Sequence, residues 1–293
     1  MLMVRVPRIT IGLLLRGIAV LATGGSAVVR ADAADLTPEG PRSFVLAGDI
    51  GYYFSDQDNS TLHVVAPRIA GQYAFDERFS IAADFGVVIL SQSPDRGPGD
   101  AATARPGNPV AMGLMRGEVG ALRYRLGLGG AAPLAVVERD GDGRLQRAAY
   151  DFARGMSGLW DVWVWGPSRG AVFGYFKLEY APHPEVDLEL ELQPALLIPA
   201  REAFQRDPLD FYLPSAITLL AHKGPLRAGL RVQAVFMPTV EPDMMQLTLE
   251  PVVRVLIGPA FVEARYTAPV DEPLSGERGP RVWAVHLAGG GAF

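Results

Sequence analysis

Residues 185–193 read EVDLELELQ, a strict alternation of polar and apolar side chains. Successive side chains of a β-strand point to opposite faces, so this segment would form one charged face and one apolar face as a strand. As an α-helix, the same residues would carry charge all around the axis. The stretch therefore predicts a strand with polar surroundings on one side and apolar surroundings on the other.

The same alternation recurs along the chain and defines twelve candidate strands. Most are longer than the five or six residues typical of soluble sheets and close to the length that a tilted strand needs to cross a bilayer. The exact number of strands stays open between about ten and fourteen. The candidate strands are residues 44–54, 62–75, 79–90, 109–118, 121–132, 170–181, 185–199, 210–222, 225–237, 245–257, 260–270 and 281–293.

The connections between these strands alternate in length. Short turns on one rim and long polar loops on the other are typical of a transmembrane antiparallel up-and-down β-barrel with both termini on the short-turn side. We therefore predict an all-β barrel whose termini lie in the periplasm. The short connections are 76–78, 118–120, 182–184, 223–224 and 258–259, and the longer ones are 55–61, 91–108, 133–169, 200–209, 238–244 and 271–280.

The first 33 residues have the pattern of a cleaved signal peptide. Arg5, Arg8 and Arg16 precede an uncharged apolar run at 17–29, and small residues follow it. An uncleaved membrane anchor is the alternative, but the run is shorter than the ~20 residues that span a bilayer. We predict a signal peptide at 1–33 and one barrel domain at 34–293.

Composition excludes several classes of function. The chain has no cysteine, which removes disulfides, thiolate metal sites and cysteine nucleophiles. A formal net charge of −5 gives no basic surface for nucleic acid. We predict no cofactor, no bound metal and no nucleic-acid partner.

The last strand carries a more specific pattern. Trp283, Val285 and Leu287 alternate, and the chain stops at the aromatic residue Phe293. This end resembles the terminal strand of Gram-negative outer-membrane β-barrel proteins, in which a final Phe and alternating apolar positions act as the assembly signal. The resemblance implies a bacterial outer-membrane location, contact with outer-membrane lipid and recognition by the barrel assembly machinery.

A narrower and weaker resemblance rests on two short motifs. Gly107-Asn108-Pro109 before a strand and the LGLG run at 126–129 resemble the porin-like transporters grouped with phenol meta-pathway degradation proteins. Glycine, asparagine and proline together also simply favour a turn.

Alternation places many charged side chains of both signs on the inward face of the strands. Twelve strands enclose a narrow space, in which charges must be paired or hydrated. Two interpretations stay open: a ladder of ion pairs that holds the barrel shut, or a charged path for small polar solutes. The predicted lumen-lining residues are Arg123, Arg125, Lys177, Glu179, Asp187, Glu189, Glu191, Arg227, Arg231, Glu250, Arg254, Glu263 and Arg265.

The pattern favours a porin-like channel or transporter, for a small solute that the sequence does not identify. A non-conducting structural or adhesive barrel is the alternative, and an outer-membrane lipid hydrolase is favoured less. Catalysis needs a base at the rim where substrate arrives, and His63 is the candidate on the long-loop side. We predict that the protein is not an enzyme. The motif at 140–143, DGDG, lacks the closing glutamate of a calcium loop and indicates a turn.

The connection at 133–169 departs most from the barrel pattern. Apolar residues between Leu145 and Leu159 recur every three or four positions, which predicts an amphipathic helix, and three tryptophans follow it at 160, 163 and 165. One interpretation places the tryptophans at the start of the next strand, in the aromatic girdle. The other folds the loop into the barrel mouth, where Arg154 and Asp161 would constrict the path.

Overall fold

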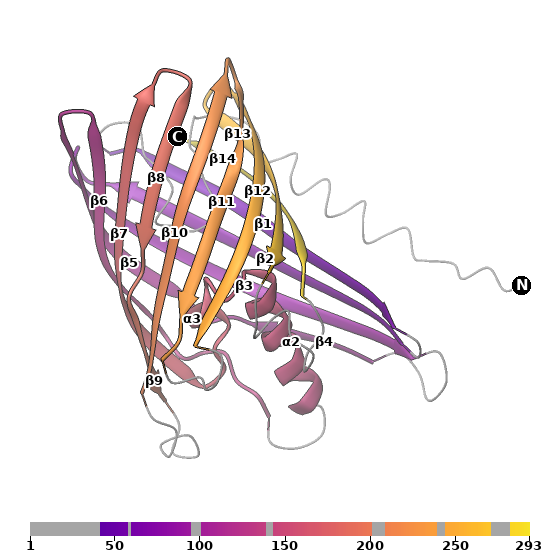
Figure 1. The fold of residues 1–293 in the computed structure, drawn as a ribbon. Helices are drawn as coiled ribbons and strands as arrows, with labels where there is room; N and C mark the ends of the chain where they lie inside the picture. Colours follow the sequence, from indigo (N-terminus) through magenta and orange to yellow (C-terminus); the bar gives the residue numbers. More distant parts are fainter. Residues whose placement is uncertain are drawn as a thin grey trace, which may run out of the picture.

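The computed structural model of the chain describes residues 42–57, 60–94, 101–138, 143–200, 209–238, 244–270 and 282–293, and the predicted signal peptide lies outside these ranges. Antiparallel strands make up most of the structure (Figure 1). Two helices, α2 (Gly143–Met156) and α3 (Val162–Trp165), lie between the sixth and seventh strands. The strands are β1 Phe44–Gln57, β2 Ser60–Ala74, β3 Phe79–Pro94, β4 Ala101–Pro106, β5 Val110–Val119, β6 Leu122–Ala131, β7 Arg169–His183, β8 Val186–Leu192, β9 Ala195–Pro199, β10 Asp210–Lys223, β11 Leu226–Phe236, β12 Met245–Ile257, β13 Ala260–Pro269 and β14 Ala284–Ala292.

The sheet closes into a twelve-stranded barrel, as the sequence predicts. β14 pairs with β1, and β10 pairs with β11, so the ladder of hydrogen bonds returns to its start. β4 lies outside the ring, and β8 and β9 together occupy the one position between β7 and β10. Closure leaves no free strand edge within the barrel wall, which is the condition for strands to lie in lipid.

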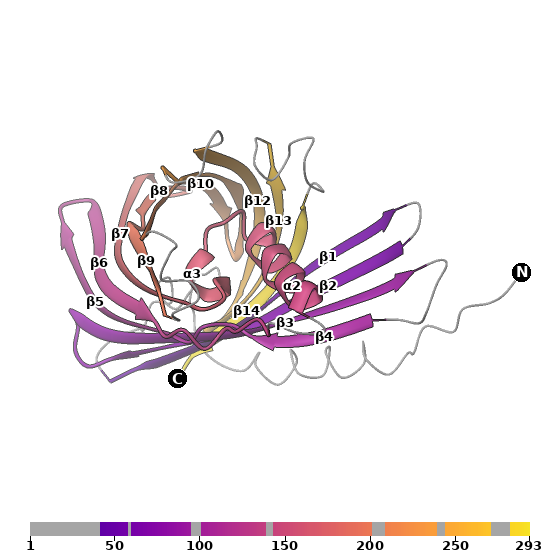
Figure 2. The ribbon, with the colours of Figure 1, turned by 90° about the horizontal axis from the view of Figure 1, so that it is seen from below.

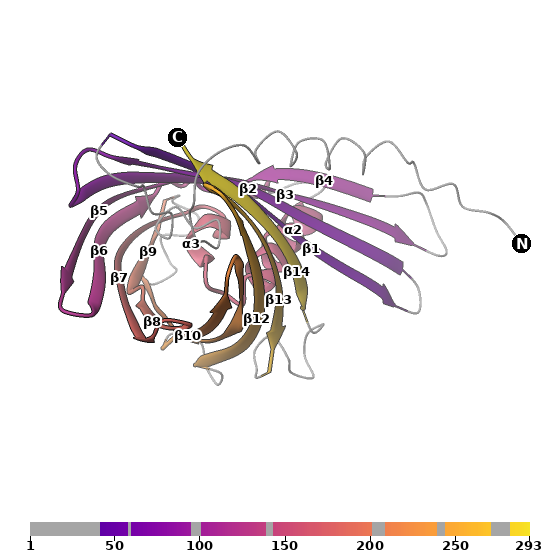
Figure 3. The same ribbon diagram turned by 90° about the horizontal axis from the view of Figure 1, so that it is seen from above.

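The first hairpin is longer than predicted. In the predicted connection 55–61, residues 55–57 and 60–61 are paired strand, because the β1–β2 ladder continues as far as Gln57 and Ser60. The predicted connection 91–108 is also partly strand, since β4 pairs with the far end of β3. The views along the barrel (Figures 2 and 3) show β1 to β4 extending beyond the ring of strands.

The predicted strand 185–199 is interrupted. Gln193 and Pro194 separate β8 from β9, because proline has no N–H to donate to the ladder. Backbone hydrogen bonds from Gln193 to Pro214 and from Gly174 to Pro194 bridge the interruption on both sides. The barrel wall therefore continues through the break.

Apolar side chains cover the outer face of the barrel. On β10, Ile217 and Leu219 are about half exposed, whereas Ala216 and Leu220 point inward and are buried. An apolar band of this extent is unusual on a protein surface in water and matches the lipid-facing band of a membrane barrel. Among the described residues, no helix is long and apolar enough to cross a membrane.

The short turns lie at one end of the barrel, the upper end in Figure 1. Gly120, Gly224 and Gly258 adopt positive φ angles of 62°, 58° and 57°, a conformation that glycine takes without steric cost. In the turn between β2 and β3, the Asp76 carboxylate accepts hydrogen bonds of 2.7 Å from the backbone N–H groups of Phe79 and Arg78. These bonds lower the pKa of Asp76. Their contribution to the stability of the folded state is therefore present above the ordinary pKa of aspartate and is lost as the pH falls.

We expect Leu190→Arg to impair assembly, because the side chain lies on the outer face opposite Leu178 and Ile217. A charge near the bilayer midplane costs roughly 2–4 kcal/mol. The folded fraction after refolding into vesicles, read from heat-modifiable gel migration across a urea series, measures the effect. Leu190→Met is the matched control, and equal folded fractions for the two variants would contradict the outward assignment.

Candidate functional site: the barrel lumen and its inserted segment

The segment between β6 and β7 folds into the barrel. In the view from below (Figure 2), α3 lies inside the ring of strands and α2 lies against β1 to β4. The predicted amphipathic helix corresponds to α2, whose Tyr150 and Met156 are fully buried. We call residues 143–166 the inserted segment. The chain before the segment and the chain after it meet, because Ser168 N–H donates to the Ala135 carbonyl at 2.7 Å.

The three tryptophans belong to the inserted segment, so the girdle interpretation is wrong. Trp160 precedes α3, and Trp163 and Trp165 lie within it; all three are at most 3% exposed. Trp163 stacks on Phe173 of β7 with ring centroids 4.8 Å apart. Each ring therefore faces the inside of the barrel, where it displaces water from the lumen.

Small residues in the wall make room for these rings. A Cβ atom at Gly86 would lie 2.6 Å from the Trp165 ring, and one at Gly107 would lie 3.1 Å from it. Trp160 instead meets a cation, since the Arg231 guanidinium carbon lies 4.2 Å from its ring centroid. Such a contact contributes about 0.5–2 kcal/mol, more where water is excluded.

Asn108 is the principal polar anchor of the inserted segment. Its side-chain Nδ2 donates to the carbonyls of Trp163, Gly166 and Arg169 at 2.8–3.0 Å, and its Oδ1 accepts from Ala135 N–H at 2.7 Å. The residue is fully buried between β4 and β5. The sequence predicts only a turn or a family motif at Asn108 and gives no sign of this role, because its partners lie 27 to 61 residues away in the chain.

A second set of bonds fixes the middle of the segment to the opposite wall. Gln233 Nε2 donates to the carbonyls of Ser157 and Gly158 at 3.1 and 2.9 Å, and His286 Nε2 lies 3.0 Å from the Met156 carbonyl. Gly158 has a φ of 61°, and a Cβ there would lie 2.7 Å from Gln233. The close approach of the chain to β11 therefore requires glycine.

The outer end of α2 is attached to β4. Gln146 and Glu138 exchange two hydrogen bonds of 2.8 and 3.1 Å, and Arg105 of β4 lies 3.2 Å from the Glu138 carboxylate. The hydrogen bond from Gln146 and the charge of Arg105 lower the pKa of Glu138. Tyr150 also donates to the Pro106 carbonyl at 2.8 Å. The segment is thus held at its entry, its middle and its exit.

The two predicted constriction residues have different positions. Asp161 is 2% exposed and forms an ion pair with Arg68 of β2, which also pairs with Asp84 of β3. Arg154 pairs with Asp151 on its own helix and is half-buried. Asp161 therefore joins the inserted segment to the wall, whereas Arg154 stays on α2.

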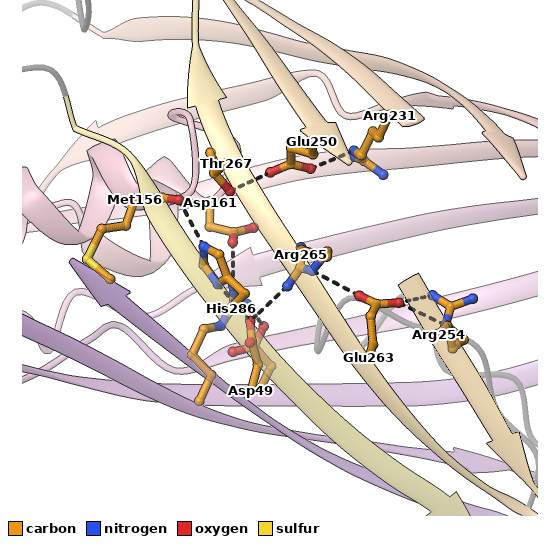
Figure 4. Close-up of polar contacts among 12 residues, drawn as sticks. Asp49, Met156, Asp161, Arg231, Glu250, Arg254, Glu263, Arg265, Thr267 and His286 are labelled. Atoms are coloured by element: carbon orange, nitrogen blue, oxygen red, sulfur yellow. Dashed lines mark hydrogen bonds and ion pairs between the residues drawn. The ribbon is translucent and has the colours of Figure 1, made fainter. Parts of the chain in front are cut away.

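Charged side chains of both signs form a ring on the inner wall at the level of this contact. Arg265 of β13 lies 2.9 Å from Glu263 and 3.0 Å from Asp49 (Figure 4). Lys177 Nζ lies 3.0 Å from Glu189 and 3.4 Å from Glu191. We call these residues the charged belt: Asp49, Arg68, Asp84, Arg125, Lys177, Glu179, Glu189, Glu191, Arg231, Glu250, Arg254, Glu263, Arg265 and His286.

The charged belt contains ten of the thirteen predicted lumen-lining residues. The other three, Arg123, Asp187 and Arg227, lie closer to the short-turn rim. There Asp187 is 3.8 Å from Arg227 and 3.5 Å from His222, and the Arg123 side chain is 58% exposed. The rim is therefore wetter than the belt, whose Lys177 and Glu191 side chains are each 2% exposed.

The remaining sequence candidates lie apart from the lumen. His63 Nδ1 is 3.0 Å from the Tyr52 hydroxyl, and this pair lies in the first hairpin. Residues 55–57 and 60–61 of the predicted loop belong to the paired strands of the same hairpin. Three of the four residues of the predicted turn at 140–143 lie outside the described residues.

The predicted assembly-signal residues are at the closing seam. Val285 and Leu287 are 39% and 49% exposed on the outer face, and Phe293 is 64% exposed and forms backbone hydrogen bonds with Phe44. Trp283 precedes β14 and is only partly buried against Tyr53 and Tyr266. The pattern thus ends at the junction between the first and last strands.

Solved structures of known proteins share the barrel fold of this chain. The chain is similar to an outer-membrane channel from Pseudomonas putida F1, with 13% identity and a TM-score of 0.57 over 91% of this chain and 100% of that chain. The NanC porin (8% identity, TM-score 0.48, 84% and 98% covered) and a Pseudomonas aeruginosa FadL homologue (9%, 0.40, 90% and 92%) are more distant. No protein-family model matches the chain, and no curated protein matches it. At these identities the likeness concerns the fold, which is that of Gram-negative outer-membrane β-barrels.

We expect Asn108→Ala to loosen the inserted segment, because it leaves two or three carbonyls and the Ala135 N–H without a partner. Each unsatisfied buried group costs about 1–3 kcal/mol. Asn108→Asp should be worse, since its carboxylate would face those carbonyls. Acrylamide quenching of tryptophan emission should rise in both variants. Leu114→Met, a change of similar volume in β5, is the control, and quenching unchanged from that control would contradict the anchor.

Proposed function

We propose that the protein is a porin-like channel for small polar solutes in the outer membrane, narrowed by the inserted segment. The observation that carries this proposal is the charged belt. A barrel that only needed stability would be served as well by apolar side chains, because buried ion pairs are often no more stabilising than well-packed apolar residues. Rings of charged side chains are a usual means of conducting and selecting polar solutes.

The attachment of the inserted segment supports the same function. It is held by side-chain anchors such as Asn108 and Gln233 and by the pair between Asp161 and Arg68, and it does not join the strand ladder. A segment bound in this way can narrow a path without being part of the wall. The barrel fold shared with an outer-membrane channel is consistent with this proposal.

A closed structural barrel is the second candidate, and the burial of the belt favours it. The Glu263 and Glu250 side chains are each 1% exposed, and both face arginines. In a closed structural barrel, the ion pairs and the tryptophans would fill the lumen permanently. A measurement of conductance separates the two candidates. We propose no catalytic activity.

We expect replacement of residues 136–167 by a short Gly-Ser turn to raise single-channel conductance in a planar bilayer. The replacement suits the structure because Ala135 and Ser168 are already hydrogen-bonded, so β6 and β7 can keep their pairing. Refolding must be verified by heat-modifiable migration. A folded variant with the conductance of the full chain would contradict the constriction, and an absence of conductance in both would favour the closed barrel.

We propose that the short turns face the periplasm and the long connections face the cell exterior. Because the chain has no cysteine, single cysteines give clean labelling. Met244→Cys, before β12 at the long-connection end, should react with an impermeant maleimide on intact cells. Lys223→Cys, at the end of β10 beside the short turn to β11, should react only after the outer membrane is permeabilised. The reverse pattern would invert the orientation.

A further inference from the structure

We propose that His286 is a pH-sensitive latch that holds the inserted segment against the barrel wall when its imidazole is protonated. The ring lies on β14 and points into the lumen between two acceptors (Figure 4). Nε2 is 3.0 Å from the Met156 carbonyl at the end of α2, and Nδ1 is 3.5 Å from the Asp49 carboxylate on β1. The histidine thus contacts the inserted segment through one ring nitrogen and the neighbouring wall strand through the other.

The chemistry of imidazole makes this position sensitive to protonation. A neutral ring has one N–H, so it donates to the Met156 carbonyl or to Asp49 and presents a lone pair to the other acceptor. A protonated ring donates from both nitrogens and bridges the two. Protonation therefore fixes Nε2–H as the donor to the Met156 carbonyl of the segment and makes that hydrogen bond charge-assisted, while Nδ1–H faces Asp49 on the wall.

Charged groups of both signs lie around the ring. The carboxylates of Asp49, Asp84 and Asp161 face two guanidiniums, those of Arg68 and Arg265. With His286, this cluster holds three acidic and three basic groups.

The other charged groups near this cluster do not change the count. Glu263 lies 2.9 Å from Arg265 and pairs with Arg254, so that acid and that base compensate each other. From the inserted segment, the Met156 carbonyl and Asp161 face the cluster. The groups facing His286 thus come from β1, β2, β3, β13 and the segment itself.

The backbone opposite His286 is shaped for the contact. Gly51 of β1 pairs with His286 in the strand register. A Cβ at this position would lie 2.9 Å from the Met156 Cε atom and 3.0 Å from the His286 ring. The absence of a side chain at Gly51 therefore lets α2 end directly against the histidine.

The latch predicts that the segment is held more firmly at pH 5 than at pH 8, the interval in which histidine changes charge. Ser157→Cys supplies one reactive thiol beside the latch, in a buried part of the segment. Its rate of reaction with a small methanethiosulfonate reagent is measured on refolded protein at both pH values. The rate ratio between pH 8 and pH 5 includes the ordinary ionisation of the thiol, so it is compared with the ratio in a His286→Gln background.

We expect the ratio to be roughly tenfold larger with His286 present, the size of one charge-assisted hydrogen bond. His222→Gln is the matched control, because His222 also lies 3.5 Å from an aspartate, Asp187, but at the short-turn rim. It should leave the ratio unchanged. Asp49→Asn keeps the histidine and should reduce the ratio, which covers the case in which His286→Gln does not fold. Equal ratios with and without His286 would overturn the proposal.

Conductance gives the second readout and rests on the proposed channel function. Open probability in a planar bilayer should be higher at pH 8 than at pH 5 for the full chain and should lose this dependence in His286→Gln. An open probability that keeps its pH dependence in His286→Gln would contradict the latch. Labelling that responds to pH through His286 in a barrel that conducts at neither pH would leave the latch standing and overturn the channel.

Discussion

Closure of the strand ladder is the constraint on which the rest of this structure depends. In lipid, every backbone N–H and C=O must be paired within the protein, and a closed antiparallel sheet achieves this without free edges. The pairing of β14 with β1 and of β10 with β11 completes that circuit. Because side chains alternate along each strand, half of them are then committed to lipid and half to a narrow interior.

This division of the side chains explains why many charged residues could be assigned to the lumen from the sequence. Along β8, Asp187, Glu189 and Glu191 alternate with leucines. Because the leucines face lipid, the three acidic side chains must face the lumen. The alternation of short and long connections likewise predicted the closed barrel and its twelve strands. The same reasoning failed where local chemistry overrides periodicity. Pro194 interrupts a strand without disturbing the apolar pattern, and residues 55–57 and 60–61 are polar yet continue the first hairpin.

The inserted segment shows what periodicity could not supply. A helix at 143–156 was predicted from its apolar spacing, but nothing in the spacing of Trp160, Trp163 and Trp165 distinguishes a lipid interface from a packed lumen. The deciding partners are distant in sequence: Asn108 for the α3 carbonyls, Gln233 for Gly158, and Arg68 for Asp161. Long-range polar contacts of this kind have no signature in one sequence, so the position of Asp161 was a hypothesis and the role of Asn108 was missed.

The hydrogen bond between Ala135 and Ser168 has a consequence for the order of folding. It joins the two ends of the connection 136–167, so β6 and β7 can pair from this point as a local hairpin. The entropy cost of closing the 32 intervening residues is then met once, when this hairpin forms. The barrel wall can therefore form before the inserted segment packs into the lumen. Tryptophan burial would then report a late step, separate in time from the appearance of β-structure.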